Sequence, residues 1–232
     1  MKTETRRLLK GLIEKYDHVM QVMEHDAAKS MKEDGRAYGG FVRVAKGKIQ
    51  EFICDELVRI AWDVELGKDA KRLAINSNKI RIPIKPEYVR AIRDREIKDY
   101  ILSNIQRYHY GLYVDKHVFI DGKMILGIEC KAYTKNDLMK QILVDFDLLK
   151  TQMPNLLCYL FQLEGNPGGN NTASATALMS YFPNVDLNVI TLFNSAKIKP
   201  ADEYKFPKAL TVEKLEKMLA VLVSAFQQAR RN

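Results

Sequence analysis

The sequence contains few cysteines and no long apolar run. Its three cysteines, Cys54, Cys130 and Cys158, lie within apolar stretches, and no two of them form a CxxC pair. This pattern predicts reduced, buried thiols in a cytoplasmic protein and argues against a zinc site. No apolar run approaches the roughly 18 residues that cross a bilayer, and Met1 begins a charged helix rather than a signal peptide. We therefore expect no membrane partner.

Several motifs of other function classes are also missing. Neither GxxxxGK[ST] nor GxGxxG occurs, so no nucleotide cofactor is expected. Three of the four histidines, His18, His25 and His109, have no ligand-like spacing to Cys or Asp, which argues against an HNH nuclease. There is no internal repeat and no Ser/Pro-rich linker, so residues 1–232 are expected to form a single domain.

The residues that are present favour a folded protein with a polyanionic partner. Apolar residues make up 47% of the chain, which is enough for a substantial core. Lys and Arg exceed Asp and Glu by 8. An excess of this sign favours binding to nucleic acid through phosphate neutralisation and counterion release.

The spacing of apolar residues predicts an α/β fold. The run at 156–163 is almost uninterrupted and indicates a strand buried on both faces. Strands interleaved with helices predict a mixed central β-sheet flanked by helices. The expected helices cover about 3–32, 47–66, 86–108, 136–152 and 211–230, and the expected strands lie within 80–84, 113–131, 156–163 and 185–193.

The segment 113–131 is predicted to be a β-hairpin that carries charged groups. Asp115 lies on the outgoing strand, and Glu129 and Lys131 lie on the returning strand. Alternation along a strand places Glu129 and Lys131 on one face, beside Gly127. A carboxylate and an ammonium are costly inside a strand unless they pair or bind something. A structural salt bridge across the strands is the alternative to a functional site.

The position of Asp115 depends on the turn of this hairpin. A three-residue loop, Asp121–Lys123, sets Asp115 directly opposite Glu129. A two-residue Asp-Gly loop points the two side chains to opposite faces, unless a bulge intervenes. Both registers stay open at this point. Asp121 belongs to the turn and is rejected as a ligand.

These residues resemble the signature of the PD-(D/E)XK nuclease superfamily. The signature is Val114-Asp115 followed by Ile128-Glu129-Cys130-Lys131, with Val where the namesake motif has Pro. The wider arrangement is similar to that of type II restriction endonucleases. The resemblance covers about 47–193, which it identifies as the catalytic core, with helical additions at both ends.

The resemblance implies a magnesium-dependent site for DNA hydrolysis. Asp115 and Glu129 would coordinate Mg²⁺, and the backbone carbonyl of Cys130 would add a ligand. Lys131 would orient or help deprotonate the attacking water, and burial beside a metal would lower its pKa. The products would carry a 5′-phosphate and a 3′-hydroxyl.

A further metal ligand is implied on the helix before the hairpin. The pattern Gly47-x-x-x-Glu51 resembles the extra acidic position of many restriction enzymes. Glu56 is an alternative to Glu51, and for either residue a solvated helix carboxylate explains the sequence equally well.

Contacts to double-stranded DNA are expected from two polar loops and one helix start. Amide and hydroxyl side chains can both donate to and accept from base edges, although ordinary exposed loops also explain them. A palindromic site would imply a homodimer, with the apolar N-terminal or C-terminal helix as its interface. The candidate contacts are Arg36, Tyr38, Lys135, Asn136, Lys140, Asn166, Asn170, Asn171 and Thr172.

The sequence therefore favours a type II restriction endonuclease that acts on double-stranded DNA with Mg²⁺. A repair or junction-resolving nuclease of the same superfamily is the second hypothesis. A DNA-binding module in which Asp115, Glu129 and Lys131 form a structural ion network is the third.

Overall fold

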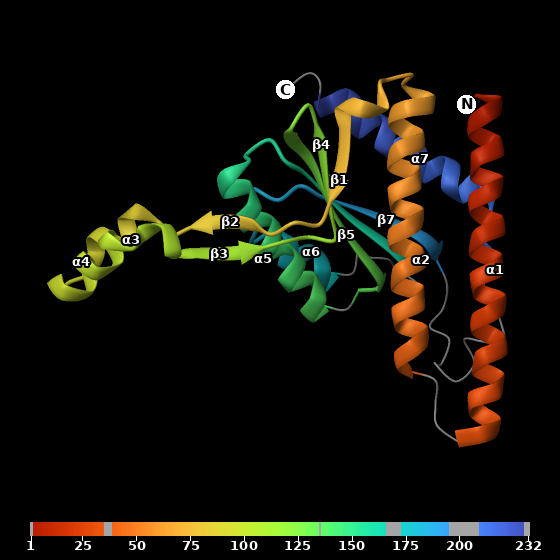
Figure 1. Cartoon of the computed structure of the whole chain (residues 1–232), viewed down its shortest axis with the longest axis horizontal. Coiled ribbons are helices and arrows are strands. Elements are labelled where there is room, and N and C mark those ends of the chain that lie inside the picture. The colour runs from red at the N-terminus through yellow and green to blue at the C-terminus, as the bar shows by residue number, and fades with distance from the viewer. Residues whose placement is uncertain (1, 35–38, 135, 166–172, 195–208, 230–232) are drawn as a thin grey trace.

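A mixed five-stranded sheet lies at the centre of the protein (Figure 1). The computed structural model describes residues 2–34, 39–134, 136–165, 173–194 and 209–229. The strand order is β1-β4-β5-β6-β7; β1, β4 and β5 are antiparallel, whereas β5, β6 and β7 are parallel. The predicted mixed α/β fold is confirmed. The strands are β1 (Leu73–Asn76), β4 (Lys116–Ile120), β5 (Lys123–Tyr133), β6 (Leu157–Gly165) and β7 (Leu187–Asn194).

The apolar strand β6 is buried on both faces, as predicted. Tyr159 and Phe161 belong to one core cluster, and Cys158 and Leu160 belong to a second cluster on the other face. Helices cover both faces because each face needs an apolar partner. They are α1 (Thr3–Asp34), α2 (Gly39–Arg59), α5 (Asn136–Gln152), α6 (Ala173–Met179) and α7 (Val212–Ala229).

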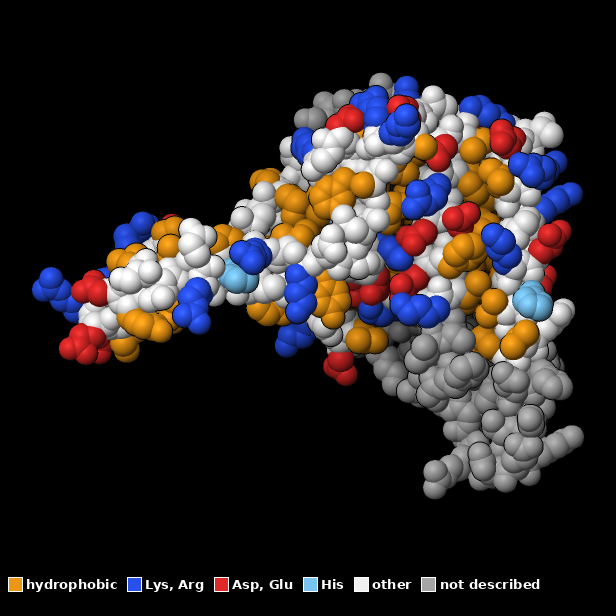
Figure 2. All heavy atoms as spheres, viewed as in Figure 1, with side chains coloured by type: hydrophobic (Ala, Val, Ile, Leu, Met, Phe, Trp, Pro, Cys, Tyr) orange, Lys and Arg blue, Asp and Glu red, His pale blue; other side chains and the backbone are white. Residues whose placement is uncertain are grey.

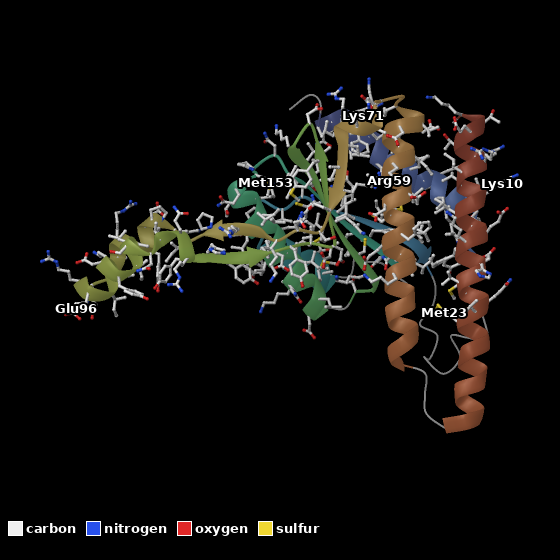
Figure 3. All side chains as sticks on the ribbon, viewed as in Figure 1. Lys10, Met23, Arg59, Lys71, Glu96 and Met153 are labelled. Atoms are coloured by element: carbon white, nitrogen blue, oxygen red, sulfur yellow. The ribbon has the colours of Figure 1, made fainter. Side chains whose placement is uncertain are left out.

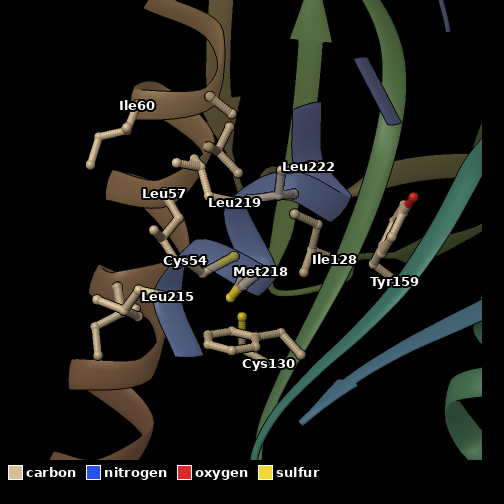
Figure 4. Packing of buried hydrophobic residues seen from close by; sticks show 14 of the residues in the cluster. Cys54, Leu57, Ile60, Ile128, Cys130, Tyr159, Leu215, Met218, Leu219 and Leu222 are labelled. Atoms are coloured by element: carbon tan, nitrogen blue, oxygen red, sulfur yellow. The ribbon is translucent and has the colours of Figure 1, made fainter. Parts of the chain in front are cut away.

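Helices α1, α2 and α7 form the layer on one face of the sheet (Figure 1). Cys54 of α2 and Met218 of α7 pack against Ile128 and Cys130 of β5 (Figure 4). Leu9, Leu12 and Tyr16 of α1 and Met218 and Leu222 of α7 are buried in this core, so these side chains are not available to the dimer interface expected on the N-terminal or C-terminal helix. The homodimer itself stays a prediction. A π-helical segment, Ile60–Glu65, continues α2.

Helix α5 covers the opposite face of the sheet and packs closely against strand β5 of the hairpin. Its Phe146 is fully buried and lies over Gly127 of β5. A Cβ atom added at Gly127 would lie 2.8 Å from Phe146 Cε1, which is closer than real Cβ contacts. Gly127 therefore permits the close approach of α5 to β5 next to Glu129.

An arm projects from the body between β1 and β4 (Figure 1). It consists of the two-stranded sheet β2 (Ile80–Pro83) and β3 (His109–Leu112), with α3 (Pro86–Ala91) and α4 (Arg95–Ser103) beyond it. The single helix expected over 86–108 is wrong. Asp94 interrupts it, because its side chain accepts a hydrogen bond from the Ile97 N–H at 3.0 Å and so begins a new helix.

The other helices and strands agree with the expectations apart from the following differences. The second helix begins at Gly39 rather than near residue 47, and β1, β3 and α6 were not predicted. Each missed element is short, so none of them shows a sustained apolar pattern in the sequence. Within the described part of the chain, no helix combines the length and apolar character needed to cross a membrane.

Candidate active site

The hairpin has a two-residue turn followed by a β-bulge. Asp121 and Gly122 have φ angles of 51° and 78°, and Ile120 pairs with Lys123 across them. Two central residues with positive φ are typical of the tight turn that joins twisted strands. The register then shifts between Val118 and Phe119, which leaves one extra residue on β5. The two-residue loop with a compensating bulge is thus the register that the protein adopts.

The bulge places the returning strand correctly for the site. Ile125 and Leu126 are consecutive, yet both belong to the core cluster under α2 and α7. Beyond them Lys116 pairs with Ile128, so continuing the register by one residue sets Asp115 opposite Glu129. Without the extra residue these two carboxylates would face opposite layers.

Asp115 is held by three hydrogen bonds to its neighbours. Its N–H donates to Glu129 Oε2 at 3.1 Å, and its Oδ2 accepts from the Cys130 N–H at 2.8 Å. Its carbonyl oxygen accepts from the Ser77 hydroxyl at 2.6 Å. The carboxylate is therefore fixed against the strand that carries Glu129.

Lys131 joins the two carboxylates. Its Nζ lies 2.9 Å from Asp115 Oδ2 and 2.5 Å from Glu129 Oε1. The side chains of Lys131, Asp115 and Glu129 retain 27%, 25% and 14% of their surface exposed, so the cluster is partly open to solvent. The structure therefore brings together the three residues predicted to be catalytic.

The charges of the cluster compete for one ammonium. Burial raises the pKa of Glu129, and repulsion from Asp115 adds to this, so that Lys131 offsets the rise only in part. Burial opposes the charged form of Lys131, but attraction to Glu129 and Asp115 outweighs it and raises the pKa of Lys131. The sequence analysis expected a lowered pKa for Lys131 beside a metal. The two carboxylates alone have the opposite effect and raise it.

Glu51 lies in a different ion cluster. Its Oε1 is 3.1 Å from Lys48 Nζ, and its Oε2 is 3.6 Å from Lys116 Nζ. Lys116 also pairs with Asp55 at 2.8 Å. Successive side chains alternate across a strand, so Lys116 points away from the face of its neighbour Asp115.

The described residues include no group of three His, Cys, Asp or Glu side chains arranged to hold a metal ion. Glu51 is therefore not brought together with Asp115 and Glu129. Its rival Glu56, on the same helix, is half-buried.

Sequence reasoning missed Gln50, which anchors the end of β5. It is fully buried on α2, and its Nε2 donates to the Lys131 carbonyl at 2.8 Å and to the Phe161 carbonyl. Gln50 thus ties α2 to the parallel strands β5 and β6 beside the cluster. The available signal was a polar residue directly after Ile49 in the apolar stripe of this helix.

A further carboxylate, Asp145 of α5, is sensitive to the charge of Lys131. Burial raises the pKa of Asp145, and attraction to Lys131 lowers it by a smaller amount.

Sequence reasoning also missed the ion pair between Lys116 and Asp55, although the sequence contains a signal for it. Lys116 lies two residues before Val118 and four before Ile120, so alternation along the strand places it on an apolar face, where a buried cation requires an acidic partner.

Two of the nine predicted DNA contacts lie in the described part of the chain. Lys140 is exposed on α5, and Asn136 begins that helix, with its side chain outside the described part. The other predicted contacts lie outside the described residues; they are Arg36, Tyr38, Lys135, Asn166, Asn170, Asn171 and Thr172.

Comparison with known proteins gives one informative match. The chain is 53% identical over 239 residues to the Type II restriction enzyme DdeI of Desulfomicrobium norvegicum (strain DSM 1741 / NCIMB 8310). The alignment covers 98% of this chain and 100% of that protein. No protein-family model matches the chain, and no solved structure matches it.

Proposed function

The chain belongs to the type II restriction enzyme family, and from this we propose that it is a Mg²⁺-dependent, site-specific endonuclease of double-stranded DNA in the cytoplasm. Cleavage would leave a 5′-phosphate and a 3′-hydroxyl. The observation that carries this proposal is the convergence of Asp115, Glu129 and Lys131 through the bulged hairpin. This geometry is consistent with a PD-(D/E)XK core at about 47–193.

The donor set suits a hard divalent cation. The Asp115 and Glu129 carboxylates both reach one nitrogen atom, so they are close enough to share a small ion. The Cys130 N–H points to Asp115, and the carbonyl of a strand residue points to the same edge as its N–H, so this oxygen is the proposed third ligand. When bound, Mg²⁺ would polarise the scissile phosphate and lower the pKa of a coordinated water.

Lys131 is assigned to orient the attacking water and to stabilise charge on the phosphate. Its pKa is raised by Glu129 and Asp115, so at neutral pH it is an ammonium that donates hydrogen bonds rather than a base. Hydrolysis forms a bond from the water oxygen to phosphorus, breaks the bond to the 3′ oxygen and leaves a proton on that oxygen. Gln50 would keep the Lys131 backbone in place during this step.

The polar segments that the sequence singled out remain the proposed DNA contacts. Asn166, Asn170, Asn171 and Thr172 would contact base edges, which is where sequence is read. Arg36, Tyr38, Lys135, Asn136 and Lys140 would contact phosphates or bases nearby.

A homodimer is also proposed, because a two-fold symmetric DNA site is best matched by two copies of one chain. Light scattering on the purified protein would then give about twice the 26.7 kDa of the chain. A monomeric mass in the presence and absence of DNA would refute the dimer and leave the nuclease proposal intact.

The nuclease proposal is tested by cleavage of plasmid and phage DNA with Mg²⁺, followed by sequencing of the fragment ends. We expect discrete fragments with one short sequence at every end. Lys131→Ala should lower the cleavage rate by about 10²–10⁴-fold, whereas Lys10→Ala, an exposed lysine on α1, should not.

Two outcomes would favour the alternatives. Cleavage governed by DNA structure rather than sequence would support a repair or junction-resolving nuclease. Binding without cleavage in any divalent cation would support a DNA-binding module with a structural ion network.

A further inference from the structure

The arm has two parts with different charge. Its stem consists of residues 77–85 and 104–113 and includes β2 and β3; its tip consists of residues 86–103 and includes α3 and α4. The tip contains four basic and four acidic residues. The stem contains no Asp or Glu, and its four basic residues are Lys79, Arg81, Lys85 and Arg107.

The basic residues of the two parts also differ in their partners. In the tip, Arg90 lies 3.3 Å from Glu87, and Arg95 lies 3.8 Å from Asp99. None of the four stem cations has a carboxylate within ion-pair distance among the described residues, and all four are exposed. The charge of the tip is therefore largely compensated, whereas that of the stem is available to an anion.

The strand pairing places Lys79 and Arg81 of the stem on one face. Arg81 pairs with Gly111, and Lys79 lies on the same face two residues earlier. The Lys79 side chain crosses Gly111, since its Cδ is 3.4 Å from a Cβ added there. Ile82 and Leu112, on the opposite face, are buried in the core cluster that contains α5. The basic face is thus turned to solvent and held by a packed face behind it.

The start of β2 and the end of β3 lie beside the candidate active site. β3 ends at Leu112, three residues before Asp115, and Ser77, just before β2, donates to the Asp115 carbonyl. Figure 2 shows Lys and Arg side chains where the arm meets the body. In Figure 3, Glu96 marks the far end of the arm, well beyond this region. A duplex cleaved at Asp115 would therefore have the stem next to it.

We propose that the basic face of the stem binds backbone phosphates of the DNA that flanks the cleaved bond. This inference rests on the proposed nuclease function and adds a binding site to it. Lys79 and Arg81 would contact phosphates nearer the cut, and Lys85 and Arg107 would extend the contact toward the tip. Such contacts position the duplex and carry no sequence information.

The salt dependence of DNA binding tests the proposal. Binding of a 40-base-pair duplex is measured over a range of NaCl concentrations, without Mg²⁺ so that no cleavage occurs. Each lost phosphate contact lowers the slope of log K against log [salt] by about 0.9. The double variant Lys79→Ala/Arg81→Ala should therefore lower the slope by about 1.8. It should leave the cleaved sequence unchanged.

The tip offers a matched control that removes the same charge from the same arm. Arg90→Ala/Arg95→Ala should leave the slope close to that of the unmodified protein, because both arginines are paired with carboxylates. Equal slopes for the stem variant and the unmodified protein would overturn the proposal, as would an equal decrease in both variants. A fall in oligomeric mass of the stem variant would instead assign the stem to contact with a second copy.

Failure of this proposal can be distinguished from failure of the nuclease function. The binding slope is measured on any duplex and needs no cleavage, whereas the nuclease function is judged from fragments. If the protein cleaves DNA but the stem variant has the same salt dependence of binding as the unmodified protein, only the proposed phosphate contacts of the stem are overturned.

Discussion

Two lysines flank Asp115 on opposite faces of the hairpin. Lys131 bonds to the carboxylates of Asp115 and Glu129, and Lys116, the residue after Asp115, bonds to Asp55 on α2. Burial of Lys116 opposes its charge, but the hydrogen bond and attraction to Asp55 together with attraction to Glu51 outweigh burial and raise the pKa of Lys116. The start of β4 is therefore fixed to α2 through one residue, while its neighbour faces the candidate site.

Lys116→Met should destabilise the protein because it removes the ammonium that bonds to Asp55 and lies between Asp55 and Glu51, while Glu51 still pairs with Lys48. Removing one partner of a fully buried pair costs about 3–5 kcal/mol. Here the carboxylate side chains keep 29% and 27% of their surface exposed, so a smaller loss of about 2 kcal/mol is expected. Urea unfolding would measure the loss in the free energy of unfolding.

A double-mutant cycle with Asp55→Asn isolates the pair in this prediction. We expect the double variant to be less destabilised than the sum of the two single variants. Additive effects within about 0.3 kcal/mol would show that Lys116 and Asp55 are not coupled.

Cys158 should be inert in the folded protein. Burial raises its thiol pKa to about 12, against an ordinary value of 9.0. At pH 9 only about a thousandth of this thiol is ionised, and the thiolate is the reactive form. Iodoacetamide should therefore label Cys158 only after unfolding in guanidinium, as mass spectrometry of its peptide would show. Labelling of the native protein at the rate of a free thiol would contradict this.

The same shift predicts a loss of stability at alkaline pH. The folded pKa of Cys158 lies above the unfolded value, so the folded state holds the proton more tightly. The stabilising contribution is complete below about pH 9 and is lost as the pH rises toward 12. Replacing Cys158 with Ala should remove this part of the pH dependence.

Among the structural elements, the hairpin turn and the bulge act together. The two-residue Asp-Gly turn alone would set a register in which Asp115 and Glu129 face opposite layers. The extra residue near Ile125 shifts this register by one, so that Asp115 and Glu129 lie opposite each other. Arg72 stabilises the turn through a 2.9 Å hydrogen bond from its Nε to Asp121. The turn is therefore structural, and the bulge is what assembles the site.

Two glycine replacements should shift stability in opposite directions. A Cβ atom added at Gly11 in α1 or at Gly122 in the turn meets nothing within 4 Å, so space is equal at both positions. Gly11→Ala should stabilise by about 0.5–1 kcal/mol, because Ala favours the helix. Gly122→Ala should destabilise by about 1 kcal/mol, because φ there is +78°.

Urea unfolding of the two glycine variants provides the comparison. Because neither substitution creates a contact, the difference between them reports backbone conformation alone. A shift of the same sign in both variants would show that another factor, such as the unfolded state, dominates.

Local patterns were sufficient to predict most elements but not their junctions. The run at 156–163 and the helix at 136–152 were found because each shows an unbroken apolar pattern. The break at Asp94 was missed because apolar residues recur every three to five residues on both sides of it. The bulge was left as an alternative to a longer loop, since no side chain in the hairpin distinguishes them.

For the molecule as a whole, the site depends on contacts that join distant parts of the chain. Asp115, Glu129 and Lys131 were predicted because they lie within one hairpin. Gln50 reaches the Lys131 carbonyl from α2, a relation that depends on how the layers pack. No local spacing encodes such a contact, which is why sequence reasoning missed it.

The arm contrasts with this connected body. Of the eleven large hydrophobic residues exposed in the described part of the chain, six lie between Ile80 and Leu112. Val89 and Ile101 in the tip are buried, but they belong to neither of the two core clusters of the body. The tip is therefore a small unit whose folding is supported mainly by its own contacts.

Hydrogen exchange should reveal the tip as a separately opening unit. Because few buried contacts support them, the amides of α4 should exchange at least about a hundredfold faster than those of β5, which is paired on both sides. Ile101→Ala should speed exchange in α3 and α4 and leave β5 unchanged, as peptide-level mass spectrometry would show. Equal acceleration in the tip and in β5 would instead mean that the arm and the body unfold as one cooperative unit.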